Sequence, residues 1–142
     1  MPVALFTHLA CLDHDPGTWH PECPDRLRAV LRALEHPDFV PLLRKQAPEA
    51  TREQLQLVHP AAYVEAILAI HPDPGERLQL DADTAMSTGS AAAARRAAGG
   101  AVAAVDAVME GWAQSAFVAA RPPGHHAEPA RPMGFCLFGN AA

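Results

Sequence analysis

The feature that most constrains the fold of this chain is the alternation of short apolar runs with longer segments of helical periodicity. Residues 3–6 (VALF) and 115–120 (SAFVAA) are almost continuously apolar runs of strand length. Such runs are typical of strands buried on both faces of a parallel sheet. Because parallel strands need long crossover connections, which are usually helices, the pattern predicts an α/β protein.

Four helices are predicted between these runs. The first has leucine and valine at helical spacing and should end at His36, because proline disfavours helix in the residue before it. Thr51 and Gln54 form a capping-box pattern at the start of the second. The predicted spans are Pro24 or Asp25 to His36, a short helix from Thr51, Pro60 to His71, and Ser87 or Ser90 to Gly111.

The last of these helices is rich in alanine and contains two adjacent glycines, Gly99 and Gly100. Glycine inside a helix costs stability relative to alanine, so we expect close packing against a neighbouring sheet or helix at these positions. Residues at i, i+3 and i+4 spacing form an apolar stripe along the same helix. The stripe consists of Ala98, Ala101, Val102, Val105, Val108 and Met109.

The composition excludes several classes of protein. The chain is 49% hydrophobic and 19% charged, with a net charge of -5 and no long basic run, which argues against nucleic-acid binding. The N-terminal apolar run is too short for a signal peptide or a membrane span. Three cysteines without a CxxC motif argue against a disulfide framework and favour a reducing compartment, so we expect a cytoplasmic protein.

Two adjacent histidines, His125 and His126, follow the second apolar run across the segment Arg-Pro-Pro-Gly. Sites in open parallel sheets gather beyond the carboxyl ends of strands, and the two prolines stiffen this segment. Adjacent side chains on an extended chain project in roughly opposite directions, so the pair is poorly arranged to share one metal ion. It is better suited to acid–base work by one ring and positioning by the other. Taken alone, the dipeptide fits ordinary buried or surface histidines equally well.

Four segments of the chain, in the right order, resemble the histone deacetylase family within the arginase–deacetylase group of metallohydrolases. They are HPECPDRL (20–27), VHPAAYV (58–64), LDADTAMSTGS (80–90) and RPPGHHA with GFCLF (121–138). The style is closest to bacterial and class II-like members. The resemblance implies a three-layer α/β fold in which helices flank a parallel sheet. It also implies a zinc-dependent amidohydrolase that removes acetyl from acetyl-lysine or a small acetylated amine.

Roles for the two histidines follow from the resemblance. In such enzymes zinc polarises the amide carbonyl and lowers the pKa of a bound water. His126 matches the general base that acts on this water and then protonates the leaving amine. His125 matches the histidine that assists electrostatically.

Four further residues match family positions at the substrate channel. Gly134 and Phe135 look like a backbone contact and one wall of the channel. Asp83 resembles a rim aspartate that contacts the substrate backbone. Arg26 resembles an arginine near the inner cavity for acetate release. Without the resemblance, Phe135 would be expected in the core, Asp83 in a turn or cap, and Arg26 on a solvated helix face.

The chain departs from the family pattern in two places. Gly139 stands where an asparagine usually follows the GFC motif, which is expected to perturb a helix there. The family's zinc ligands, an Asp/His/Asp set, and its oxyanion-stabilising tyrosine lie further along than any motif found here. The resemblance therefore implies that residues 1–142 are the N-terminal portion of a single deacetylase domain, truncated before the metal site and inactive alone.

Two alternatives remain open at this point. His8, Cys11 and His14 have H-x2-C-x2-H spacing, which would suit a small metal-binding module. The second alternative is a non-catalytic fragment. A truncated sheet would leave an unpaired edge and exposed apolar surface, so we expect self-association.

Overall fold

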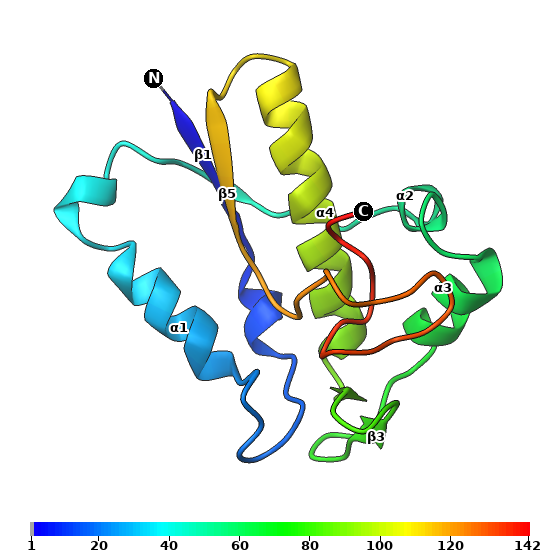
Figure 1. Ribbon diagram of the computed structural model, residues 1–142. Coiled ribbons are helices and arrows are strands. Elements are labelled where there is room, and N and C mark those ends of the chain that lie inside the picture. The colour runs from blue at the N-terminus through cyan, green and yellow to red at the C-terminus, as the bar shows by residue number, and fades with distance from the viewer. Residues whose placement is uncertain (1) are drawn as a thin grey trace.

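A parallel three-stranded sheet lies at the centre of the molecule (Figure 1), in a computed structural model that describes residues 2–142. Strand β1 (Val3–Thr7) lies between β2 (Leu43–Gln46) and β5 (Ser115–Ala119), and both neighbours run parallel to it. A separate two-stranded antiparallel sheet pairs β3 (Leu78–Gln79) with β4 (Ala85–Met86). The predicted parallel α/β class and both apolar strands are confirmed, whereas β2 was not predicted.

The helices follow the predicted order with shorter spans. Helix α1 ends before His36, because Leu34 already adopts the C-cap position. The predicted capping box is present at the start of α2, where Thr51 accepts from the Gln54 amide and Gln54 accepts in return. The helical elements are η1 (Leu9–Leu12), α1 (Pro24–Ala33), η2 (Pro37–Phe39), α2 (Arg52–Gln56), α3 (Ala61–Leu68) and α4 (Ser90–Met109).

Helices cover both faces of the sheet, which gives three layers (Figure 1). Alternate residues of β1 point to opposite faces. Ala4 and Phe6 pack with Ala107 of α4 in one buried cluster. Leu5 packs with Leu27 of α1 in another. The strand is therefore apolar at consecutive positions because each face meets a helix.

The N-terminus of α4 differs from the prediction. Its N-cap is Gly89, and no side chain caps the helix. The Ser90 hydroxyl instead accepts from the Ser87 amide at 2.7 Å and hydrogen-bonds to His14 Nδ1 at 2.7 Å. Neither predicted serine caps α4, because their hydroxyls join the helix start to the N-terminal loop.

The paired glycines of α4 lie at close approaches, Gly100 against the sheet as predicted and Gly99 against an irregular segment. A Cβ on Gly100 would lie 3.1 Å from Ala47 Cβ and 3.2 Å from Val118 Cγ1, at the sheet. A Cβ on Gly99 would lie 2.1 Å from the carbonyl oxygen of Pro48, in the segment that follows β2. Backbone of one segment therefore occupies the space that a side chain would need.

We expect Gly99→Ala to lower the free energy of unfolding by about 1–3 kcal/mol, because overpacking against backbone outweighs the gain in helix propensity. Urea unfolding of the purified chain measures this change. Ala92→Gly is the matched control, since Ala92 is exposed on the same helix and reports the propensity difference alone. Greater stability of Gly99→Ala would contradict the close approach.

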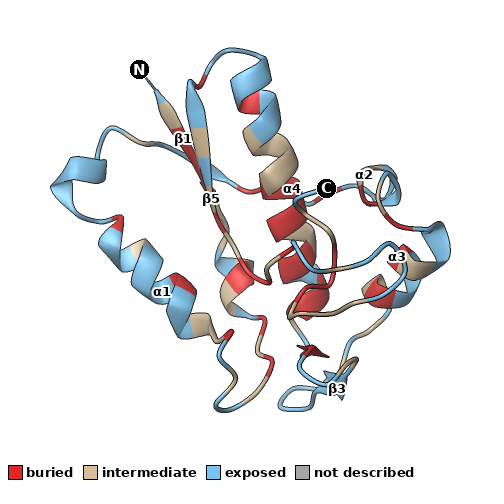
Figure 2. Cartoon of the chain, in the orientation of Figure 1, coloured by how far each residue is buried: buried red, intermediate tan, exposed pale blue. Residues whose placement is uncertain are grey.

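Most of the apolar stripe predicted on α4 lies off its buried face, although Ala98 is buried in the core. Val105 and Met109 are 61% and 80% exposed, whereas Ala93 and Ala97 are buried. Figure 2 shows buried residues over the first half of α4 and exposed residues near its C-terminal end. Small residues face the sheet because they let the helix approach it closely, so the larger side chains of the stripe point outward.

Apolar surface is also exposed at the sheet edge. Strand β5 pairs only with β1 in the described sheet, and Phe117 at its centre is 48% exposed. Unpaired strand edges and exposed apolar side chains are the features that favour association. Self-association through this surface stays a prediction.

Candidate active site

One cavity of about 440 Å³ brings together every residue that the sequence predicted for the site. Its wall is built from four separate parts of the chain, and it lies beyond the carboxyl end of β5, where sites of parallel sheets are expected. The lining residues are Pro21, Glu22, Arg26, Asp83, Pro123, His125, His126, Gly134 and Phe135. The structure supports the grouping of these residues, while their individual roles stay predictions.

The two histidines lie side by side rather than pointing apart. The ring centroids of His125 and His126 are 4.2 Å apart, with an angle of 51° between the ring planes. The expectation of opposite directions was wrong, because the backbone bends at both residues and is not extended. Both side chains are exposed at the cavity, so one ring can meet a ligand while the other contacts its neighbour.

A tight turn places Gly134 and Phe135 against the histidine pair. Both have left-handed backbone, with φ of 57° and 70°, and the turn closes through a bridge between Met133 and Cys136. A Cβ on Gly134 would lie 2.6 Å from His126 Cβ, so only glycine allows this approach. Phe135 is half-buried at the cavity and is not a member of the described core clusters.

Two residues that the sequence did not single out hold the Phe135 side of the cavity. Buried Thr84 accepts from the Phe135 amide at 3.0 Å and donates to Asp83 Oδ1 at 3.1 Å. The His20 ring packs edge-on against Phe135 with centroids 4.8 Å apart, and its Nε2 donates to the Asp83 carbonyl at 2.8 Å. Asp83 is thus exposed at the rim on a backbone that is fixed from both sides.

The inner wall contains a buried ion pair that the sequence did not reveal. Glu22 and Arg121 are each 2% exposed, and Arg121 Nη2 lies 2.7 Å from Glu22 Oε2. Arg26, in the first turn of α1, donates to Glu22 Oε1 at 3.3 Å with 61% of its side chain exposed. The feature of the sequence that could have indicated this ion pair is the charged residue Arg121, which lies between a buried strand and two prolines.

Comparison with known proteins decides the family. The model of the histone deacetylase domain matches residues 20–142. The chain belongs to the histone deacetylase family. It is 41% identical over 124 residues to a histone deacetylase-like amidohydrolase of Pseudomonas aeruginosa, covering 87% of this chain and 32% of that protein. It is 40% identical over 139 residues to a probable deacetylase of Methanothermobacter thermautotrophicus, covering 97% and 40%.

A solved structure shares the fold. The crystal structure of the HDA15 HD domain superposes with a TM-score of 0.89 at 34% identity, over 99% of this chain and 40% of that one. The predicted arginase–deacetylase type of α/β fold is therefore confirmed. The chain spans about a third to two fifths of the length of these relatives.

The alternative metal module in the N-terminal loop is not formed. His8 Nδ1 accepts from the Ala10 amide, and Cys11 is fully buried. His14 is buried against Ser90, and burial together with the Arg121 guanidinium lowers its pKa to about 3. The three side chains point into different surroundings because η1 turns the chain between them.

The described residues do not form the zinc site that the sequence resemblance implies. No group of three or more histidine, cysteine, aspartate or glutamate side chains within residues 2–142 is arranged to hold a metal. Among the same residues, no helix is both long enough and apolar enough to span a membrane.

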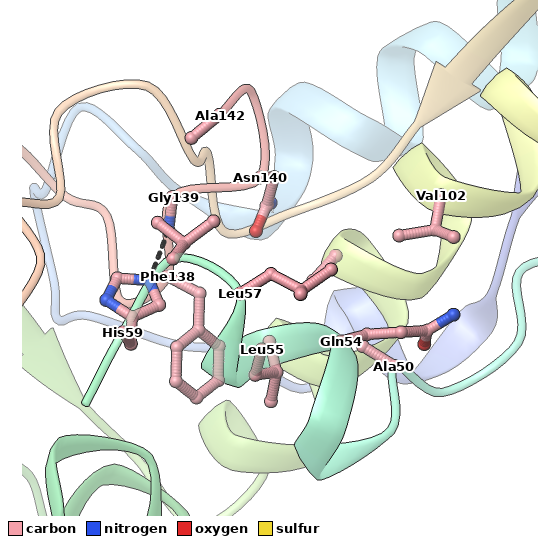
Figure 3. A pocket seen from close by; sticks show the side chains of 12 residues that line it. Ala50, Gln54, Leu55, Leu57, His59, Val102, Phe138, Gly139, Asn140 and Ala142 are labelled. Atoms are coloured by element: carbon pink, nitrogen blue, oxygen red, sulfur yellow. Dashed lines mark hydrogen bonds between the residues drawn. The ribbon is translucent and has the colours of Figure 1, made fainter. Parts of the chain in front are cut away.

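A second, apolar cavity of about 100 Å³ is lined by residues that include Leu55, Val102, Phe138 and Gly139 (Figure 3). His59 Nε2 accepts from the Gly139 amide at 2.9 Å, and its Nδ1 donates to the Pro129 carbonyl at 2.7 Å. Tyr63 donates to the Leu137 carbonyl at 2.6 Å, and burial raises the pKa of its hydroxyl. Gly139 begins no helix within the described residues. These contacts anchor the segment that carries Phe135.

Proposed function

We propose that the domain containing this chain hydrolyses the acetyl amide of acetyl-lysine or of a small acetylated amine, in a zinc-dependent reaction. The observation that carries the proposal is the single cavity around Arg26, Asp83, the histidine pair and the Gly134–Phe135 turn. The names of the relatives point to the same chemistry, since they include an amidohydrolase and a probable deacetylase.

The histidine pair would handle protons. We assign His126 as the base that accepts a proton from the attacking water and then returns it to the leaving amine. Its close approach to Gly134 supports this role, because an acylated amine lying along the Phe135 turn would present its amide to the same ring. The ring centroid of His125 lies 4.2 Å from that of His126. His125 would stabilise the charge that develops in the transition state and hold the His126 ring in place.

The rest of the cavity would select the substrate. The half-buried ring of Phe135 offers an apolar wall for the methylene chain of an acylated amine. Asp83, exposed at the rim, would accept hydrogen bonds from amide N–H groups that flank the chain. Arg26 would favour the carboxylate product at the inner end, although its guanidinium already donates to Glu22.

We expect the purified 142-residue chain to hold no stoichiometric zinc and to show no hydrolysis of an acetyl-lysine reporter. The reason is that the described residues contain no group of three suitable ligands. Metal analysis by mass spectrometry and acetate release measure the two properties. Robust hydrolysis by this chain alone would overturn the assignment of the metal ligands to other parts of the domain.

A complete deacetylase domain that contains residues 1–142 tests the function itself. It should release acetate from acetyl-lysine peptides, acetylpolyamines or small acetylated amines, and a chelator should abolish the activity. Failure on all three substrate classes would contradict the proposal. We further propose a cytoplasmic location, supported by the three cysteines, which are all free.

A further inference from the structure

We propose that the buried Arg121–Glu22 pair is a positioning device that holds the His125–His126 loop against the N-terminal wall of the cavity. The inference rests on the proposed function, because it deals with the geometry of the proton-handling histidines. Neither residue is assigned to touch the substrate. They act through the loop, so they are positioning residues.

All five N–H donors of the Arg121 guanidinium are used, which is the full capacity of the side chain. Nε donates to Glu22 Oε1 at 2.8 Å, and Nη2 donates to Oε2 at 2.7 Å and to the Glu22 carbonyl at 3.0 Å. Nη1 donates to the carbonyls of Cys11 and His14 at 2.8 and 2.7 Å. One planar group thus fixes three points of the N-terminal segment, one within η1 and two in the loop between η1 and α1.

Arg121 lies close to the histidines in the sequence, so its hydrogen bonds restrain the loop that carries them. It lies between the end of β5 at Ala119 and His125. The two prolines that follow have no N–H to donate, so backbone hydrogen bonds from that segment are few. His126 itself is held by a 3.4 Å contact from its amide to Cys136 Sγ, which is a weak acceptor.

Glu22 connects Arg121 to the wall of the cavity. It lines the cavity beside the histidines, although only 2% of its surface is exposed. Its amide donates to His20 Nδ1 at 3.1 Å, and His20 in turn packs on Phe135. The pair therefore connects the histidine side of the cavity to the Phe135 side through Glu22 and His20.

A positioning role and a purely stabilising role of the pair predict different results when both residues are replaced. Removing one partner of a buried ion pair leaves an uncompensated charge, whereas replacing both partners by apolar residues is often neutral or stabilising. A purely structural pair would therefore be replaceable by two methionines. A positioning pair would not, because methionines cannot reproduce the fixed fork of five hydrogen bonds.

The experiment compares Arg121→Met/Glu22→Met with Arg121→Lys in the isotope-labelled chain. Lysine keeps the charge but cannot reach three carbonyls and a carboxylate at once. We expect both variants to fold, and both to lose the cross-peak between the His125 and His126 rings that a 4.2 Å centroid distance predicts. In a complete domain, kcat should fall by about 10²-fold with KM nearly unchanged, the scale of a small misplacement of reacting groups.

Arg95→Met/Glu49→Met is the matched control. Arg95 Nη1 lies 2.8 Å from Glu49, and Arg95 Nε donates to the Ala50 carbonyl, away from the cavity. This variant should keep the wild-type ring cross-peak and kcat. If the Met–Met variant fails to fold, Arg121→Lys and the isosteric Glu22→Gln decide the question.

Wild-type ring cross-peaks and kcat in Arg121→Lys or in the Met–Met variant would overturn the proposal. The same change in the Arg95 control would also overturn it, because the effect would then be general. The ring cross-peaks need no enzymatic activity. An inactive complete domain would therefore contradict the proposed function while the cross-peaks still decide the positioning role.

Discussion

Replacing His126 with alanine should lower kcat of a complete deacetylase domain containing this chain by about 10²–10⁴-fold, the usual contribution of a positioned acid–base group. The reason is that His126 contacts the turn carrying Phe135 and is exposed at the cavity, where it can reach a bound amide. Zinc content should stay normal, because the variant removes a base and not a ligand. Steady-state kinetics together with metal analysis check both parts.

Two variants control for general effects. His125→Ala should cost less in kcat, because the assisting ring does not transfer the proton. His36→Ala removes an exposed imidazole that pairs with Asp38 and does not line the cavity, so it should leave kcat unchanged. Loss of zinc in His126→Ala would show that the residue is a ligand and that the role assigned here is wrong.

Acidification should destabilise the chain through His14. Burial, followed by the nearby Arg121 guanidinium, lowers the pKa of His14 from 6.5 to about 3. Between these values the unfolded chain binds a proton that the folded chain does not, so protonation favours unfolding. Stability from this group is complete above pH 6.5, and it falls by about 1.4 kcal/mol per pH unit towards pH 3.

Urea unfolding at several pH values between 4 and 7.5, spaced about one pH unit apart, measures how the free energy of unfolding depends on pH. His14→Asn, which removes the titrating ring, should show a shallower slope than the wild type. His36→Asn, which removes an exposed ring and keeps the buried one, should retain the wild-type slope. Equal slopes for wild type and His14→Asn would contradict the assignment, since carboxylates would then account for the whole dependence.

Prediction of the fold from the sequence succeeded where burial leaves a pattern. Strands β1 and β5 were found because helices cover both faces of the sheet and force consecutive apolar residues. Strand β2 was missed because its residues, Leu43–Gln46, are all exposed at the sheet edge. A strand held by backbone hydrogen bonds at an edge needs no apolar side chains, so it leaves no such pattern.

The motifs name the predicted site residues, but the contacts between them cannot be read from the sequence. The six predicted residues line one cavity, as the motifs implied. The direction of the histidine rings was wrong, because a bend in the backbone is not visible in the dipeptide. Thr84 was passed over because a threonine that bridges Asp83 to the Phe135 amide has no sequence signature of its own.

The sequence by itself determined the parallel α/β class, the family, and the segments that carry the site, because each depends on local residue type and order. Only the tertiary structure decided the partners of buried charges. Glu22 and Arg121 lie 99 residues apart and meet because β5 ends beside the N-terminal loop. A buried charge takes its partner from whatever segment the fold brings near, and that choice depends on packing of the whole chain rather than on neighbours in sequence.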